Sequence, residues 1–505
     1  MADQQPAFGI EAPIAAVLFV GFLILIGYYS YRKRIGTSVY DFFLASRVLG
    51  YVVLGLSLYA AQYSGNSFIG YAARSYRSGF VFLMYPTFMI TILPFTIILA
   101  ARLIPISTVR KLTSPMDFIR LRYGYEKKWM LNALAVLTLV FLVWGTFVQF
   151  FEQAIAMGYL GEVVSAGMIP YMYMVVVFVV GVIIFTILGG FRGTALANAI
   201  MGLTMLVGLM GTLILVTKDF GSIGDAVTTL ASKKPALIST PTSFTTIVNW
   251  FSTIFLVGAG APLYIHILQH LLATKDPSTY KRTLIFTPYF YLLTAMSLVL
   301  IGVCGAAIIP GLGTMESERI VPLLVVKAAP VDPAAKALGL LWMLALLSAT
   351  LSTAATTTIA ISVTVLREVF RAFKPRASER EIVLASRVLL ALIALLAIPI
   401  VIEPRATIWR WTEIKFEGLI QAFPAIVLGL YIPWVNVKGL LSGMTVGAVV
   451  GITLSLTGYT TYQGLHAGII GLIINVLICL IVSRLTAKPD EVGYAKNVLS
   501  VEQIT

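Results

Sequence analysis

Two short stretches of small, polar or helix-breaking residues interrupt long apolar segments of the sequence. The first runs from Gln62 to Ser67, and the second, from Gly258 to Pro262, combines two glycines, two alanines and a proline. Backbone that is unwound inside a membrane leaves amide and carbonyl groups without partners, and lipid cannot supply them. We therefore expect both stretches to line a cavity that holds a solute or an ion.

A broken helix also exposes free amides and the positive end of a helix dipole, which favour an anionic group. The predicted solute is therefore small and carries a carboxylate. The residues expected to contact it either donate hydrogen bonds without a charge or permit close backbone approach. They are Gln62, Ser64, Gly65, Asn66, Ser67, Gly258, Gly260 and, from a later span, Gln421. Hydrogen bonding between helices is the alternative role for the polar members.

Charged side chains are rare within the apolar segments. Glu152 lies inside one of them, where an unpaired carboxylate is costly. We expect Glu152 to face the cavity, to pair with a base or to carry a proton, and it is the candidate proton site. Glu413, Lys415 and Glu417 cluster at the expected outer start of another segment, which indicates an interfacial salt bridge or an outer gate.

The sequence offers little for metal-dependent or covalent catalysis. His266 and His270 are four residues apart on one expected helix face, but no glutamate lies between them and no third ligand is evident, which disfavours a metalloenzyme. Cys304 and Cys479 both fall inside apolar segments, so a disulfide framework is not indicated. No pair of nucleophile and base is evident, and we expect neither an enzyme nor a cofactor other than a coupling ion.

Long apolar helices must position these residues. Apolar residues make up 59% of the 505 positions and charged residues 11%, less than half of the ~25% typical of a soluble protein. Because a span needs ~20 apolar residues, we predict an all-α polytopic membrane protein with thirteen transmembrane helices. A single membrane domain is expected over 1–485, followed by a cytoplasmic tail at 486–505. The first span, 12–31, has no cleavage site after it and is expected to be retained.

The two interrupted spans each open a set of five spans, over 51–216 and 244–433. An odd number of spans makes the second set run opposite to the first, an inverted repeat found in many carriers. One extra helix, 12–31, precedes the repeats, and two extra helices, 437–483, follow them.

The basic residues predict the orientation. With the N-terminus outside, most of the 36 Lys and Arg residues fall in cytoplasmic loops, as the positive-inside rule requires, and the C-terminus lies in the cytoplasm. Their spread over many short loops argues against nucleic acid as a partner and favours the lipid bilayer. A plasma membrane of prokaryotic type is the expected location, and the oligomeric state stays open.

Several short motifs follow one another along the chain: Asp41 to Arg47, Phe68-Ile69-Gly70, Gly189-Gly190-Phe191-Arg192, and Tyr431-Ile432-Pro433 through Lys438-Gly439. In this order and spacing they resemble the sodium/solute symporter family, in particular its pantothenate and proline carriers, from Tyr40 to Leu485. The resemblance implies the leucine-transporter-type fold with one extra helix before a ten-helix core, and sodium as the coupling ion.

The resemblance also implies a sodium site between the first interrupted span and the span near residue 350. Backbone carbonyls would come from Ala60, Tyr63 and Leu346, and hydroxyls from positions 349 and 350. Thr350 supplies one hydroxyl, but Ala349 has none, which removes a ligand.

A second departure from the family is Asn198. Family members commonly have an aspartate there, which the resemblance implies can serve an additional sodium together with hydroxyls at the positions of Ser352 and Thr353. Sodium coupling is the leading hypothesis, and proton coupling or uniport by the same fold is the alternative.

Together these features predict a secondary transporter that moves a small carboxylate-bearing solute with a cation by alternating access. A channel is the rival of a different class, but neither a repeated filter loop nor a ring of charge is evident. A sensor is also disfavoured, since only about twenty residues follow the last expected span.

Overall fold

The structure is a computed structural model that describes residues 6–32, 44, 47, 49–370 and 378–500. Most of the motif from Asp41 to Arg47 lies outside the described residues. The side chains of 188–192 are also outside the description, so the motif from Gly189 to Arg192 is placed only as helical backbone.

The long helices form the body of the protein. They are α1 (Glu11–Arg32), α5 (Met84–Arg110), α7 (Lys128–Val164), α8 (Tyr171–Phe220), α10 (Phe244–Gly260), α13 (Thr287–Ile308), α15 (Pro333–Val365), α17 (Glu379–Val401), α20 (Val437–Leu456) and α21 (Ala467–Thr486).

Shorter α-helices connect or extend the long ones: α3 (Tyr51–Gln62), α4 (Ala72–Ser78), α6 (Pro115–Arg122), α9 (Ile223–Lys233), α11 (Ile265–Leu272), α12 (Pro277–Thr283), α14 (Ile320–Ala328), α18 (Ile408–Leu419), α19 (Gly429–Tyr431) and α22 (Pro489–Leu499). Tighter or wider helical turns are η2 (Asn66–Tyr71), η3 (Gly79–Leu83), η4 (Pro235–Leu237), η5 (Ala261–Leu263), η6 (Glu316–Arg319), η7 (Leu366–Phe370), η8 (Ile420–Ala422) and η9 (Pro424–Leu428). Two short strands, β1 (Thr461–Tyr462) and β2 (Leu465–His466), pair antiparallel.

Among the described residues, eleven helices or runs of helices are long and apolar enough to cross a membrane. Two shorter apolar helices, Tyr51–Gln62 and Tyr171–Ile187, complete the apolar set. A straight helix of the 50 residues of α8 would measure about 75 Å, more than twice the ~30 Å of the hydrocarbon layer. The count of thirteen spans therefore stays a prediction that depends on these segments.

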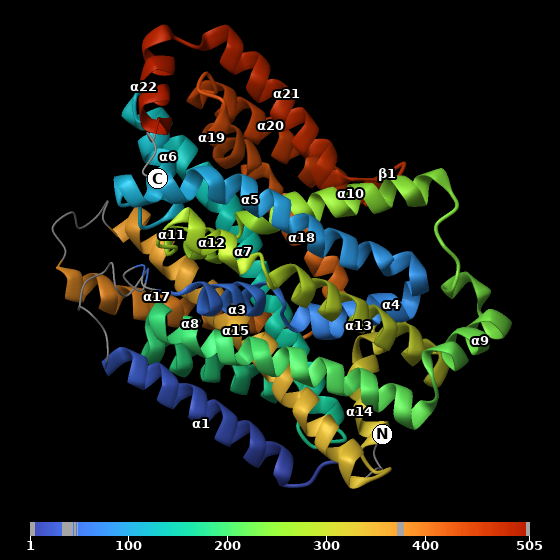
Figure 1. Ribbon diagram of the computed structural model, residues 1–505. Helices are drawn as coiled ribbons and strands as arrows, with labels where there is room; N and C mark the ends of the chain where they lie inside the picture. The colour runs from blue at the N-terminus through green and yellow to red at the C-terminus, as the bar shows by residue number, and fades with distance from the viewer. Residues whose placement is uncertain (1–5, 33–43, 45–46, 48, 371–377, 501–505) are drawn as a thin grey trace.

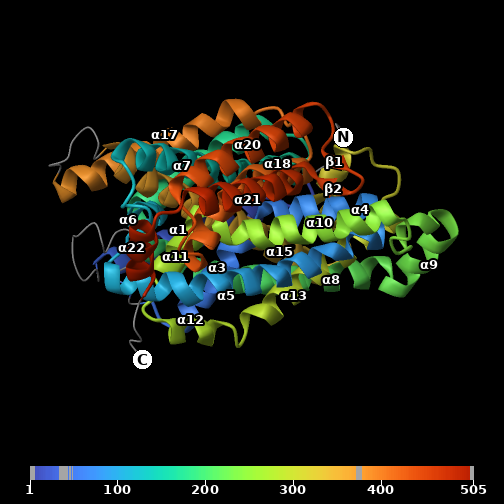
Figure 2. The same cartoon turned by 90° about the horizontal axis from the view of Figure 1, so that it is seen from above.

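The long helices run side by side between two ends of the molecule (Figures 1 and 2). The N-terminus lies at one end and the C-terminus at the other, and α6 and α22 lie at the C-terminal end in both views. Helix α1 packs against α8 on one flank, while α20 and α21 form a pair on the opposite flank (Figure 1).

Both predicted interruptions are present. Helix α3 ends at Gln62, and Tyr63 is extended, with φ −90° and ψ 125°. Helix α10 ends at Gly260, the Pro262 turn follows, and Tyr264 is extended, with φ −52° and ψ 135°. Proline has no amide hydrogen and small polar residues compete for backbone bonds, so these sequences stop the helix where the pattern predicted.

Glycine allows α13 to approach the second half of the first interrupted helix. A Cβ added to Gly302 would lie 2.3 Å from the carbonyl oxygen of Ala72 and 2.7 Å from Cβ of Ser75, both in α4. This close contact fixes α4, which continues the helix after the first interruption.

We expect Gly302→Ala to destabilise the protein by about 1–3 kcal/mol, because the added methyl group overpacks the contact with α4. The control is Gly181→Ala in α8, where an added Cβ meets nothing within 4 Å and helix propensity favours alanine. Thermal unfolding of the purified protein in detergent checks both variants. Equal melting temperatures for Gly302→Ala and the parent would contradict the close packing.

Candidate functional site

The first interruption is held by side chains of α7. The amide of Gly65 donates to Oε1 of Gln153 at 2.7 Å, and Nε2 of Gln149 donates to Oγ of Ser64 at 3.1 Å. Within the interruption, the hydroxyls of Ser64 and Ser67 both donate to Oδ1 of Asn66. The predicted polar stretch is therefore buried protein interior, and helix α7 partners its backbone and side chains.

The second interruption is held by the same face of α7. The amide of Ile265, the first residue of α11, donates to Oγ1 of Thr146 at 3.2 Å. The hydroxyl of Tyr264 donates to Oε1 of Gln149 at 3.1 Å. Gln149 therefore touches both interruptions at once, through its amide nitrogen on one side and its amide oxygen on the other.

Glu152, one residue away from Gln153 on α7, forms an ion pair with Lys415 of α18. The distance from Nζ to Oε2 is 2.5 Å, and neither side chain has any exposed surface. Nζ of Lys415 also donates to Oε1 of Gln149, and the hydroxyl of Thr412 donates to Oε1 of Glu152 at 2.8 Å. Of the three roles expected for Glu152, the structure shows pairing with a base.

The position of Lys415 differs from the interfacial salt bridge expected for the cluster on α18. Lys415 points into the helix bundle and lies 5.8 Å from the ring centre of Tyr264 and 5.2 Å from that of Phe416. Glu413 and Glu417 instead pair with Arg410. Residues 413 and 417 are four apart and lie on one helix face, whereas residue 415 lies on the opposite face, so the cluster splits into a pair of glutamates beside Arg410 and a lysine directed into the bundle.

A group of oxygens lies between α3 and α15. The hydroxyls of Ser352 and Thr353 reach the carbonyl oxygen of Ala60 at 2.8 and 3.4 Å, and the hydroxyl of Ser352 also reaches the carbonyl of Ala349 at 3.2 Å. All of these residues are buried. This is the junction where the resemblance implied a sodium ion.

The register within α15 differs from the predicted one. The hydroxyl of Thr350 donates to the carbonyls of Leu346 and Leu347 in its own helix, at 2.9 and 3.0 Å. The hydroxyl pair beside Ala60 comes from positions 352 and 353, and position 349 contributes a carbonyl. These are the two hydroxyl positions that the resemblance assigned to an additional sodium, and they follow the carbonyl of Ala349 as positions 349 and 350 follow that of Leu346.

Asn198 of α8 contacts α3 about one helical turn before Ala60. Its Nδ2 contacts Oγ of Ser57 at 3.4 Å, and Ser57 in turn bonds Nε2 of His270 at 2.9 Å. His270 also bonds the carbonyl of His266. No group of three or more His, Cys, Asp or Glu that could hold a metal occurs among the residues the structure describes.

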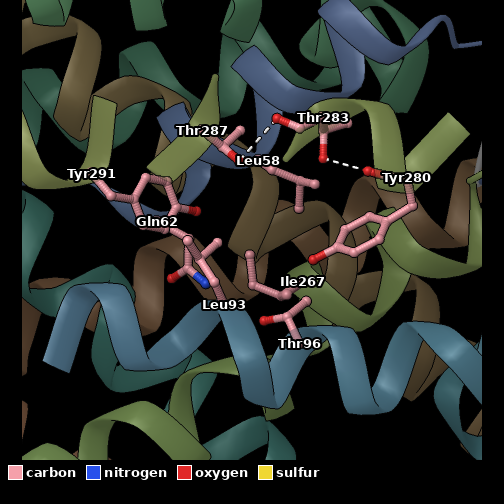
Figure 3. A pocket seen from close by; sticks show the side chains of 9 residues that line it. All are labelled: Leu58, Gln62, Leu93, Thr96, Ile267, Tyr280, Thr283, Thr287 and Tyr291. Atoms are coloured by element: carbon pink, nitrogen blue, oxygen red, sulfur yellow. Dashed lines mark hydrogen bonds between the residues drawn. The ribbon is translucent and has the colours of Figure 1, made fainter. Parts of the chain in front are cut away.

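The structure also places the other predicted solute contacts. Gln62 lines a small cavity between α3, α5, α11, α12 and α13 (Figure 3). Gly260 packs on Phe416 and Gly258 on Thr91 of α5.

Gln421 does not close the site as expected. Its Nε2 donates to the carbonyl of Gly468 at 3.0 Å, and Asn475 of α21 donates to its oxygens. It fastens α21 to η8, the turn that directly follows α18.

The residues that sequence reasoning missed are Gln149, Gln153 and Thr412, and Lys415 was assigned to the wrong environment. A signal was available in α7, where Gln149, Glu152 and Gln153 are spaced as one face of a helix within an apolar span. Polar residues at depth in a membrane face a partner or a cavity.

Solved structures of transporters share this fold. A Na⁺-coupled sialic acid symporter aligns with 95% of this chain and 99% of its own, at 18% identity and a TM-score of 0.78. Mhp1, a nucleobase-cation-symport-1 family transporter, aligns with 92% of this chain and 100% of its own, at 14% identity and a TM-score of 0.55. At these identities the likeness concerns the fold alone.

Curated relatives cover most of the chain. The sodium/pantothenate symporter of Escherichia coli is 28% identical over 442 residues, which cover 86% of this chain and 88% of that protein. The osmoregulated proline transporter of Bacillus subtilis is 25% identical over 500 residues, covering 96% and 97%. The predicted resemblance to this branch is confirmed, and the relatives are membrane transporters, not enzymes.

The profile of the sodium:solute symporter family matches residues 42–447, well over half of the sequence. The chain therefore belongs to the sodium:solute symporter family.

Proposed function

We propose that this protein is a symporter that moves a small carboxylate-bearing solute together with sodium by alternating access. The observation that carries the proposal is the meeting of two interrupted helices on one polar face of α7, beside a group of oxygens between α3 and α15. Interrupted backbone of this kind supplies ion and solute ligands in secondary transporters.

The sodium ligands in this proposal are five uncharged oxygens. They are the carbonyls of Ala60, Tyr63 and Ala349 and the hydroxyls of Ser352 and Thr353. Sodium, like calcium, is a hard cation that prefers oxygen ligands, and the extended backbone of Tyr63 takes its carbonyl out of the helical pattern. Asn198 brings no charge to this junction, which supports one sodium ion instead of two.

The solute region in this proposal lies between the two interruptions, next to Ser64, Gly65, Asn66, Ser67 and Tyr264. The similar carriers are named for pantothenate and proline, and both of these molecules carry a carboxylate. Proton coupling through Glu152 is the second hypothesis, because the ion pair with Lys415 favours the ionised carboxylate.

The proposed architecture has thirteen spans, with inverted repeats at 51–216 and 244–433, one extra helix before them and two after. Termini at opposite ends of the helices (Figure 1) support an odd number of crossings. We place the N-terminus outside and the C-terminus in the cytoplasm of a plasma membrane, with 486–505 as the cytoplasmic tail.

Uptake by the purified protein in liposomes tests this function. Labelled pantothenate, proline and short monocarboxylates are offered with a sodium gradient, with a proton gradient, or with neither. We expect saturable uptake of a carboxylate that a sodium gradient stimulates. A response to the proton gradient alone would instead support coupling through Glu152, and flux that does not saturate would support a channel.

The two possible registers of the sodium site predict opposite results. We expect Ser352→Ala and Thr353→Val to raise the sodium concentration for half-maximal uptake at least tenfold, about 1.4 kcal/mol, because each removes a ligand oxygen. Thr350→Val and Ala349→Ser should leave it unchanged, since the hydroxyl of Thr350 bonds within its own helix and Ala349 contributes only its carbonyl.

Sodium titrations of uptake measure all four variants. A weaker sodium response in Thr350→Val together with a stronger one in Ala349→Ser would instead support a sodium site formed at positions 349 and 350. Thermal unfolding with and without sodium separates lost binding from lost folding, because a bound ligand raises the melting temperature only while its site exists.

Alternating access also requires an outer gate, and Glu318 of η6 is positioned to hold it. Its carboxylate accepts from Arg77 of α4 at 2.8 Å and from the amide of Ile408, the first residue of α18, at 3.2 Å. Glu318 therefore ties the outer half of the first interrupted helix to α18. Burial raises the pKa of Glu318, while Arg77 lowers it.

We expect Glu318→Gln to open the outer side more often, because the ion pair with Arg77 is lost. The measurement is labelling of Ser67→Cys by a membrane-impermeant maleimide, with Cys304 and Cys479 replaced by alanine, and labelling should be several-fold faster in Glu318→Gln. The exposed neighbour in Glu316→Gln is the control. Since burial raises the pKa of Glu318, a lower external pH should also speed labelling of the parent. Equal labelling rates in the parent and Glu318→Gln, and at both pH values, would exclude this gate.

A further inference from the structure

The ammonium group of Lys415 has hydrogen-bonding capacity to spare. It carries three N–H donors, and among the described residues it has two oxygen partners, Gln149 and Glu152. Its other side faces the rings of Tyr264 and Phe416. Tyr264 is the extended residue of the second interruption, so the remaining donor is available toward the region where α10 gives way to α11.

The carboxylate of Glu152 is more fully used. Its Oε1 accepts from Thr412 and its Oε2 from Lys415. Asn66 also interacts with this carboxylate. The site therefore has a cationic donor ready for an anion, whereas its anion already has three neighbouring partners.

Charge balance then limits the solute. Glu152 and Lys415 together are neutral, and the proposed sodium ligands are all uncharged, so one sodium ion adds a single positive charge. A buried charge that lacks a partner is costly. A solute with one negative charge restores neutrality, while a zwitterion leaves one uncompensated positive charge inside the membrane.

We propose that Lys415 binds the carboxylate of the solute, that Glu152 is the internal counter-ion which balances Lys415 when no solute is bound, and that the solute is a singly charged anion carried with one sodium. This inference rests on the proposed function and names its substrate class. Each transport cycle then moves no net charge.

The location of the pair links binding to movement. Glu152 belongs to the first set of helices and Lys415 to the second, and both are fully buried. A solute reaches Lys415 only when the two sets separate on one side. When its carboxylate binds, it shares the cation that otherwise holds α18 to α7, so solute binding changes a fully buried ion pair between the two sets.

A double-variant experiment separates solute binding from structure. We expect Lys415→Met to weaken carboxylate binding at least tenfold, and Glu152→Gln to bind it as well as the parent or better, because Lys415 loses its internal competitor. The double variant, Glu152→Gln with Lys415→Met, buries no charge and should fold, but it should not regain carboxylate uptake. Glu413→Gln, which removes a carboxylate elsewhere on α18, serves as the control.

Recovery of uptake in the double variant would overturn the proposal, since it would reduce the pair to a structural role. Sodium-dependent thermal stabilisation without solute is measured in the same variants and should persist in all of them. If sodium does not stabilise the parent, the proposed sodium coupling is contradicted. If sodium still stabilises Lys415→Met and that variant binds the carboxylate as well as the parent does, only the role of Lys415 is contradicted.

Substrate class and charge movement are tested on the parent protein. Unlabelled acetate, propionate and pantothenate should compete for sodium-driven carboxylate uptake, while proline, alanine and the amides of the acids should not. An interior-negative potential, set with potassium and valinomycin, should change the rate less than twofold. Equal competition by zwitterions, or stimulation of tenfold or more by the potential, would overturn the charge count.

Discussion

Broken helices inside a membrane require partners for their backbone, and in this protein one face of α7 supplies them. Gln153 accepts from the amide of Gly65, Thr146 accepts from the amide of Ile265, and Gln149 bonds side chains at both interruptions. Without these bonds each interruption would leave polar groups facing apolar surroundings, which is unfavourable enough to close the helix again. This arrangement holds the two interruptions side by side against one helix.

The buried groups around the two interruptions are electrically neutral as a set. Among the described residues, only the ion pair of Glu152 with Lys415 has no exposed surface on either side chain. The oxygens between α3 and α15 carry no formal charge. Such a centre tolerates the arrival of a cation and an anion together far better than either alone. Coupling between ion and solute can therefore arise from charge balance in a confined space, in addition to any direct contact between them.

The sequence predicted where the backbone is interrupted, but it did not predict the directions in which several side chains of the site point. A run of small polar residues, or glycines followed by a proline, in the middle of an apolar segment disfavours a continuous helix, so both interruptions and the bundle of apolar helices could be inferred. In α15 hydroxyl residues occur at 348, 350, 352 and 353. Residues three apart point in directions that differ by only about 60° around the helix. The sequence therefore cannot tell which of these hydroxyls face α3. Gln421 and Lys415 failed for the same reason: each lies on the expected span but points to a different neighbour from the one expected.

The attachment of α21 to α18 through Gln421 and Asn475 has a mechanical consequence. Helices α20 and α21 pack through glycines, since a Cβ on Gly447 would lie 2.5 Å from the carbonyl of Gly471, and the two therefore behave as one rigid pair. Because this pair is fastened to the end of α18, any displacement of α18 also displaces two lipid-facing helices. In the proposed alternating-access cycle the lipid beside α20 and α21 would move with them, so the thickness and stiffness of the bilayer would contribute to the energy barrier.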